Sequence, residues 1–196
     1  MIKNLITRKT PPEKRKLKTE GVYEMHFSEA AVMLAFAFYL FKQDDSLTMV
    51  EIHPDGEHGK QFQIREWLLS HGFELKKPEG TTKYGGIYCD GVKQIYVSLK
   101  PGLGDVVATT ASYTKVAECK GGIINTKHSG QKSRLRKGLC ETVGLLMARP
   151  LSDEIQYAVV PKTPDTERLG QRMQERCRLA GIEILLMKAD GNVLKI

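Results

Sequence analysis

The pattern of apolar and polar positions in the second half of the chain predicts alternating helices and strands. Apolar residues recur every three to four positions over 131–148, which is typical of an amphipathic helix, and Pro150 follows its end. The continuous apolar runs 155–160 and 182–187 are typical of buried strands. Between these runs, Thr163-Pro164-Asp165 provides a cap, a first-turn proline and an early acid, and predicts a helix to Leu179. The alternation predicts the α/β class.

The first half of the chain predicts a strongly apolar helix followed by shorter elements. Ala30–Phe41 is apolar throughout, and Ser28 can cap its start. A bilayer span needs about 20 residues, so this run indicates a buried or dimer-forming helix and no membrane partner. We expect a strand over Leu47–His53, a helix ending near Gly72 and a short strand from Phe73. The Asp90-Gly91 turn between residues 87–89 and 92–99 predicts a hairpin.

A second hairpin carries the most informative polar residues. The strand-like runs 106–108 and 116–117 flank a turn at 110–112, and a centre between Ala111 and Ser112 places Asp105 opposite Glu118. Cross-strand partners share a face at ~5 Å between Cβ atoms, and Lys120 projects to the same face. Two carboxylates this close are costly without a positive partner. Hard oxygen ligands suit Mg²⁺, so the hairpin predicts a divalent cation.

Asp105 followed by Glu118-Cys119-Lys120 resembles the signature of the PD-(D/E)xK nuclease superfamily. The resemblance implies a restriction-endonuclease-like α/β fold, with a mixed central sheet flanked by helices over roughly residues 57–190. It implies that Asp105 and Glu118 hold Mg²⁺ or Mn²⁺, that the carbonyl of Cys119 adds a ligand, and that Lys120 activates the attacking water. Gly104 stands where the family often has proline. Pro54-Asp55 has the proline, but it is not in a hairpin with Glu118, so we assign the role to Asp105.

The same resemblance identifies the helix of residues 59–72 with the first core helix of the fold. Several relatives carry a glutamate there, at the position that Gln63 occupies in this chain. Glu66 could point inward and replace it, although a surface position is favoured. Gln131, at the start of the helix after the hairpin, is a further candidate catalytic residue that could orient a ligand or the phosphate.

Charge indicates a polyanionic partner. The 196-residue chain has a formal net charge of +7, and residues 1–20 hold seven Lys/Arg against two Glu. A basic tail suits nucleic acid, although a solubilising arm is an equal alternative. A second basic cluster follows the hairpin, and we expect it to contact DNA phosphates rather than form only the charged face of a helix. Its members are Lys127, Lys132, Arg134, Arg136 and Lys137.

These observations predict one domain with appendages and a reducing environment. We expect a flexible basic arm over 1–20, an N-terminal helix and strand with a homodimer surface over 21–56, and a nuclease-like core over 57–196. The spacing of the four cysteines fits neither a zinc ribbon nor a redox pair, which favours free thiols. No segment has the pattern of a signal peptide, so a cytoplasmic location is expected.

A smaller polar cluster precedes the second predicted helix. His53, Asp55, Glu57 and His58 could hold a metal, but His53-Pro54-Asp55-Gly56 has the composition of an exposed turn, which we favour. The hairpin therefore remains the main site. The sequence predicts a metal-dependent phosphodiesterase that cleaves DNA, an endonuclease. The alternative is a nucleic-acid-binding or regulatory subunit that has a nuclease-like fold without catalysis.

Overall fold

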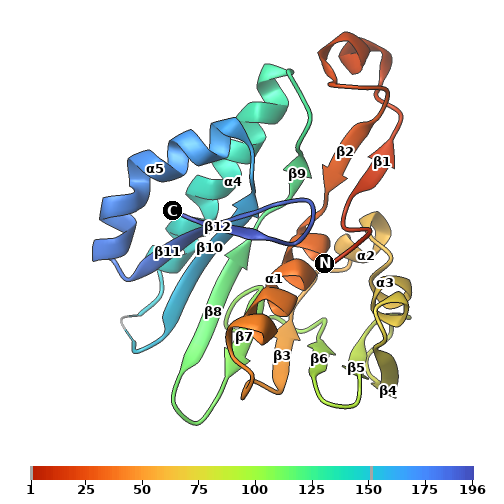
Figure 1. Ribbon diagram of the computed structural model, residues 1–196, viewed down its shortest axis with the longest axis vertical. Helices are drawn as coiled ribbons and strands as arrows, with labels where there is room; N and C mark the ends of the chain where they lie inside the picture. The colour runs from red at the N-terminus through yellow and green to blue at the C-terminus, as the bar shows by residue number, and fades with distance from the viewer. Residues whose placement is uncertain (1, 151) are drawn as a thin grey trace.

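The computed structural model describes residues 2–150 and 152–196, and among them a mixed sheet of nine strands runs through the molecule (Figure 1). The strand order is β12-β11-β10-β8-β7-β3-β6-β5-β4. β8, β10 and β11 are mutually parallel, as are β3 and β6, and the remaining neighbours are antiparallel. The strands are β3 (Met49–Ile52), β4 (Glu74–Pro78), β5 (Gly86–Cys89), β6 (Gln94–Val97), β7 (Val106–Thr109), β8 (Thr114–Cys119), β10 (Ile155–Pro161), β11 (Ile182–Met187) and β12 (Val193–Lys195).

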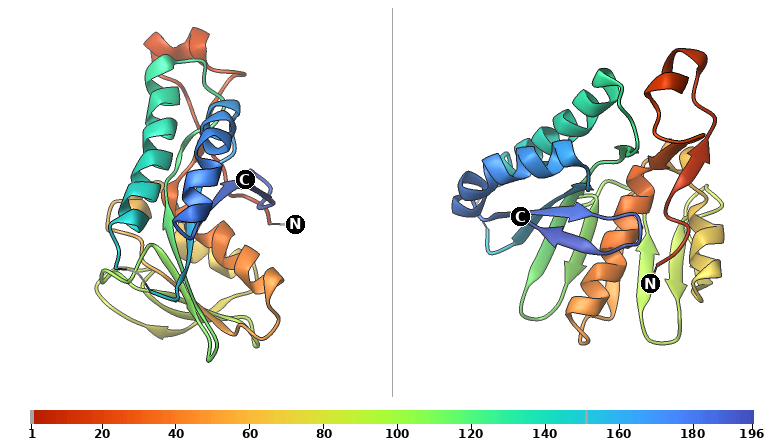
Figure 2. Two further views of the ribbon diagram at one scale, coloured as in Figure 1. Left: turned by 90° about the vertical axis from the view of Figure 1, so that its left-hand side faces the viewer. Right: turned by 45° about the horizontal axis from the view of Figure 1, so that its top comes forward.

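Helices cover both faces of the β8–β10–β11 region (Figure 2). On one face, Ala158 and Val160 of β10 pack with Leu139 of α4 (Ser129–Met147) and Cys177 of α5 (Pro164–Leu179). On the other face, Val159 belongs to the core around α1 (Glu29–Gln43). Alternate residues of one strand thus enter two cores, which explains why these strands are apolar without interruption. The predicted α/β class, with a mixed sheet flanked by helices, is confirmed.

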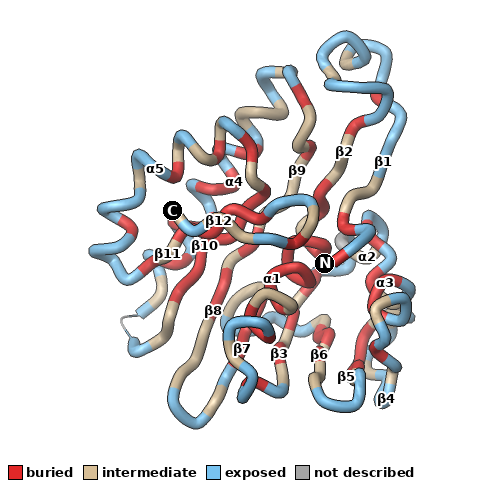
Figure 3. Tube along the Cα trace, viewed as in Figure 1, coloured by how far each residue is buried: buried red, intermediate tan, exposed pale blue. Residues whose placement is uncertain are grey.

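α1 is enclosed by the rest of the chain. Residues 30–37 are all buried, and Ile2 and Leu5 belong to the same apolar core (Figure 3). The prediction of a buried helix is confirmed, and the homodimer surface over 21–56 stays a prediction. None of the described helices has the length and apolar character needed to cross a bilayer.

The N-terminal arm is folded. β1 (Thr7–Lys9), the 3₁₀ helix η1 (Glu13–Lys18) and β2 (Glu24–Phe27) project beside the start of α4 (Figure 1). β2 also pairs with β9 (Gly122–Ile123), and the Arg15 guanidinium contacts the buried Glu24 carboxylate at 2.6 Å. Residues 7–9 and 13–18 of the predicted flexible arm thus have regular structure: β1 pairs with the nearby β2, and β2 is joined on its other side to β9, about a hundred positions further along the chain.

The predicted second helix is divided into two short ones. α2 (His58–Gln61) and α3 (Ile64–Ser70) are separated by a turn in which the Ile64 N–H donates to the Phe62 carbonyl at 3.0 Å. Phe62 is buried, and turning its ring into the core interrupts the helix. The hairpins β5–β6 and β7–β8 are present as predicted.

Candidate functional site

The register of the β7–β8 hairpin is the predicted one. Val106 pairs with Ala117 and Val107 with Val116, so Asp105 and Glu118 stand opposite each other at the open end. The Cys119 main-chain N–H donates to Asp105 Oδ2 at 2.7 Å, which fixes the Asp105 carboxylate beside the strand that carries Glu118. The Cys119 side chain is buried, so it points away from the site as strand alternation requires.

Asp105 and Glu118 open into one cavity of about 310 Å³, which Asp55 and His53 also line. The arrangement follows from the sheet, because β3 runs antiparallel to β7 and the His53 N–H donates to the Asp105 carbonyl at 2.8 Å. Asp55, which the sequence set aside, is thus a third acid of the same cavity. Glu57 is exposed and pairs with Lys60 at 2.6 Å, and the His58 side chain lies outside the described part of the chain.

The loop 99–104 forms one wall of this acidic cavity and is held at two points. His53 Nδ1 bonds to the Lys100 carbonyl at 2.8 Å, and Arg149 donates to the Leu103 carbonyl. A Cβ on Gly104 would lie 2.6 Å from a Val116 methyl and 3.3 Å from Glu118 Oε1. A proline there would collide with the site, which explains why glycine precedes Asp105.

Lys120 is placed by two acids that come from distant helices. Its Nζ lies 3.2 Å from Glu29 Oε1 and 3.4 Å from Glu141 Oε1. Glu29 is the first residue of α1, behind the Ser28 cap, and its side chain is only 15% exposed. The sequence analysis missed Glu29. The available signal was a single acid at the head of an otherwise apolar helix, which also has an ordinary explanation as a residue that complements the helix dipole.

Two acids of the site, Glu118 and Glu29, resist ionisation. Burial, and then the neighbouring charge of Asp105, raises the pKa of Glu118 to about 7. Burial also raises the pKa of Glu29, although Lys120 opposes this. For Lys120, burial lowers the pKa, but Glu29, Glu141 and Asp105 together outweigh burial and raise it. Burial raises the pKa of the Cys119 thiol well above its ordinary value, so this cysteine is no nucleophile. The site therefore holds a charged lysine beside a Glu118 carboxyl that is costly to ionise.

Gln131 and the basic cluster lie elsewhere. Gln131 and Arg134 line a second cavity, so Gln131 does not share the acidic cavity as its predicted catalytic role requires. Lys132 Nζ pairs with Asp165 at 3.4 Å and Lys127 Nζ with Glu20 at 4.0 Å. Arg136 and Lys137 are exposed on α4.

The acid that a helix brings to the site comes from α1. Glu66 of α3 is exposed, which is the position that the sequence analysis favoured, and neither it nor Gln63 lines the acidic cavity. Residues 59–72, the predicted counterpart of the first core helix, contribute no residue to the lining of this cavity. α1 takes that place through Glu29, because α1 crosses the sheet next to the β7–β8 hairpin.

The donor set of the acidic cavity suits a hard divalent cation. Asp105, Asp55 and Glu118 offer carboxylate oxygens, and the raised pKa of Glu118 indicates a place where a cation would relieve repulsion. Within the described residues, no three His, Cys, Asp or Glu side chains are already close enough to hold a metal ion together. The donor types are those that Mg²⁺ or Mn²⁺ would take.

Comparisons with known proteins identify no relative. The chain matches no protein-family model, and it has no significant match among curated proteins or solved structures.

Proposed function

We propose that this protein is a metal-dependent phosphodiesterase that cleaves DNA, an endonuclease of the PD-(D/E)xK type. One observation carries the proposal. Asp105 and Glu118 stand face to face at the open end of a single hairpin and line a shared cavity, and Lys120 follows just past the end of β8. A binding module has no need for this combination of two partly buried acids and a charged lysine.

The elements that follow the hairpin support the same proposal. After β7 and β8 come the helix α4 and then β10, which pairs with β8 in parallel, as the sequence predicts for the helix and strand after the hairpin. The difference is that α1 supplies the helix-borne acid, so the nuclease-like core would begin near Glu29 and not at residue 57.

Asp105 and Glu118 would hold the Mg²⁺ or Mn²⁺ ion, joined by the main-chain carbonyl of Cys119. When bound, such an ion neutralises charge that builds on a phosphate and lowers the pKa of a coordinated water. A carboxylate that is costly to ionise on its own, as Glu118 is, becomes a favourable ligand for a cation, because the ion supplies positive charge beside it.

Lys120 stabilises negative charge at the reacting phosphate and at the attacking oxygen. Glu29 and Glu141 fix its ammonium from two sides, so it needs little reorientation when substrate arrives. Arg149 acts as a positioning residue: it is held by Glu154 at 2.8 Å and in turn holds the loop at Leu103 over the cavity.

The test compares cleavage and binding in the same preparations. We expect the wild-type protein to cut plasmid and labelled duplex DNA with Mg²⁺ or Mn²⁺ and to stop when EDTA is added. Asp105→Asn keeps an oxygen for the Cys119 N–H, yet it should lose at least about 100-fold in cleavage rate, as should Lys120→Ala. Both should bind DNA in EDTA nearly as well as wild type. Glu66→Gln, which changes an exposed acid, should keep full activity.

Activity that persists in both site variants would show that the hairpin is not the catalytic site. The alternative function, a non-catalytic nucleic-acid-binding or regulatory subunit, has one observation in its favour: the described acids are not yet gathered into a group of three. It predicts DNA binding with no cleavage by wild type in either metal.

A further inference from the structure

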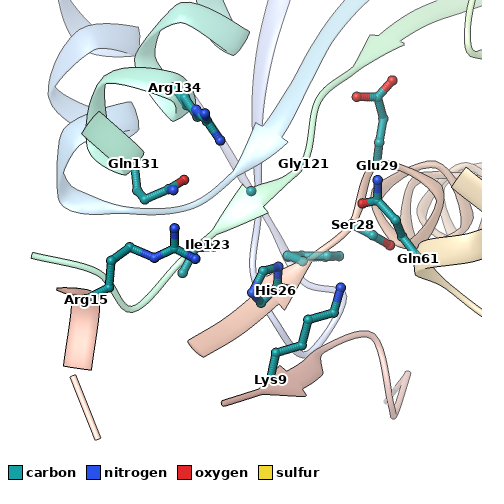
Figure 4. Close-up of a pocket in the computed structure, with 12 residues that line it drawn as sticks. Lys9, Arg15, His26, Ser28, Glu29, Gln61, Gly121, Ile123, Gln131 and Arg134 are labelled. Atoms are coloured by element: carbon teal, nitrogen blue, oxygen red, sulfur yellow. The ribbon is translucent and has the colours of Figure 1, made fainter. Parts of the chain in front are cut away.

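A second cavity has a basic lining. Its volume is about 340 Å³. The folded arm forms one wall with Lys9, Arg15 and His26, α4 forms the other with Gln131 and Arg134, and the link between β8 and β9 passes between them at Gly121 and Gly122 (Figure 4).

Part of the charge in this basic cavity is already compensated. Arg15 donates to both oxygens of the buried Glu24, at 2.6 and 3.0 Å, and His26 Nε2 lies 3.2 Å from the same carboxylate. Burial lowers the pKa of His26, and the bond to Glu24 opposes this only in part. Arg15 and His26 therefore build the wall and add little net charge to the space.

Lys9 and Arg134 differ from these residues, because neither forms an ion pair with any residue that the structure describes. They extend into the cavity from opposite walls, Lys9 from β1 and Arg134 from α4 (Figure 4). The acid at the edge, Glu29, is paired with Lys120. Two uncompensated cations that converge on a hollow favour an anion there.

Neutral donors complete the lining. The amides of Gln61 and Gln131 and the imidazole of His26 face the same space (Figure 4). Phosphate oxygens accept several hydrogen bonds at once, and protein phosphate contacts typically combine Lys or Arg with amide donors. This mixture suits a phosphate group better than a carboxylate, which has fewer acceptor positions.

The basic cavity lies directly beside the proposed reaction site. Glu29 lines it and contacts Lys120, and Gly121 is the residue after Lys120. A strand whose phosphate sits at Lys120 would therefore have this cavity as its neighbour, with Lys9 and Arg134 in the lining. In this arrangement the folded arm forms a fixed wall of the cavity, because the Arg15–Glu24 contact holds the part of the arm from which Lys9 projects.

We infer that Lys9 and Arg134 form a phosphate-binding subsite for a nucleic-acid strand, next to the site of cleavage. The inference rests on the proposed function for the identity of the ligand. Phosphate is the shared chemistry of two sources, an internal phosphodiester and the terminal phosphate of a strand end.

Binding in EDTA tests the subsite independently of cleavage. Lys9→Gln and Arg134→Gln should each lower the affinity for a fluorescent single-stranded oligonucleotide by about fivefold, and the double variant by at least about tenfold. Two lost contacts should also reduce the log–log salt slope by about 1.4 on single strands. Arg172→Gln and Lys42→Gln, which change exposed cations that do not line the basic cavity, serve as matched controls and should leave both values unchanged.

Oligonucleotides that carry a 5′-phosphate, a 3′-phosphate or neither distinguish the two sources. A preference of wild type for one phosphorylated end that the double variant loses would support the subsite and assign it to that terminal phosphate. An equal loss of affinity in the double variant on all three oligonucleotides would support the subsite and assign it to an internal phosphate. A double variant that binds within twofold of the controls, with an unchanged salt slope, would overturn the inference. The binding assay contains no metal and does not depend on cleavage. If the variants change binding as expected but the wild-type protein does not cleave DNA with Mg²⁺ or Mn²⁺, only the proposed function is overturned.

Discussion

Glu118→Gln should stabilise the protein when no divalent cation is present. The reason is that the folded protein keeps the Glu118 carboxyl at a pKa of about 7, against an ordinary value of 4.5, because the group is partly buried beside Asp105. At neutral pH the wild-type protein must either ionise this carboxyl in an unfavourable place or take up a proton. Glutamine has nearly the same shape and avoids both costs.

The magnitude and its pH dependence follow from linkage. Between pH 4.5 and 7 the folded state binds this proton more tightly than the unfolded state, so the wild-type protein loses stability as pH rises through that window. A pKa difference of about 2.5 corresponds to about 3 kcal/mol, reached near pH 7 and kept above it. At pH 5 the penalty is at most about 1 kcal/mol. The gain from Glu118→Gln should therefore grow from pH 5 to pH 8.

Urea unfolding in EDTA, followed by the fluorescence of the single tryptophan, Trp67, measures this gain. Glu175→Gln, which changes an exposed acid on α5, is the control and should alter the free energy of unfolding by less than about 0.5 kcal/mol at any pH. Adding Mg²⁺ or Mn²⁺ should reduce the difference in free energy of unfolding between Glu118→Gln and wild type, because an ion that binds only the folded wild-type site stabilises that protein by mass action. A variant that is no more stable than wild type at pH 8, or equally stabilised at pH 5 and pH 8, would refute the reasoning.

Three further substitutions test how the site is held. Gly121→Ala should lower the free energy of unfolding by about 2 kcal/mol or more, because its Cβ would lie 2.4 Å from the Glu29 main-chain nitrogen and 2.5 Å from the Phe27 carbonyl oxygen. Gly144→Ala, in the same urea assay, should raise the free energy of unfolding by up to about 1 kcal/mol, because the position is helical and has no neighbour within 4 Å. If Gly121→Ala were more stable than Gly144→Ala, both predictions would be contradicted. Arg15→Ala should loosen the arm and speed tryptic cleavage within η1, since it leaves the buried Glu24 without its guanidinium; an unchanged cleavage rate would show that strand pairing alone holds the arm.

The sequence by itself determined the elements and the pairing that depend on local periodicity. The spacing of Leu135, Leu139 and Val143 predicts α4, and the apolar run of β10 predicts a strand buried on both faces. The hairpin register also follows from local information, because a short turn leaves only one pairing that places apolar side chains in the core. Asp105 and Glu118 could therefore be set opposite each other before any fold was known, and the structure agrees.

Only the tertiary structure decided what surrounds that pair. Glu29 and Lys120 are 91 positions apart, and Asp55 enters the cavity because β3 pairs with β7. β2, the partner of β1 in the arm, pairs on its other side with β9, which lies far along the chain. Long-range contacts of this kind depend on which strands become neighbours in the sheet, a choice made by packing over the whole chain. A single acid or lysine belongs to no periodic pattern that would indicate its contact partner. The sequence therefore predicts the hairpin, but it does not predict which residues from distant elements surround it.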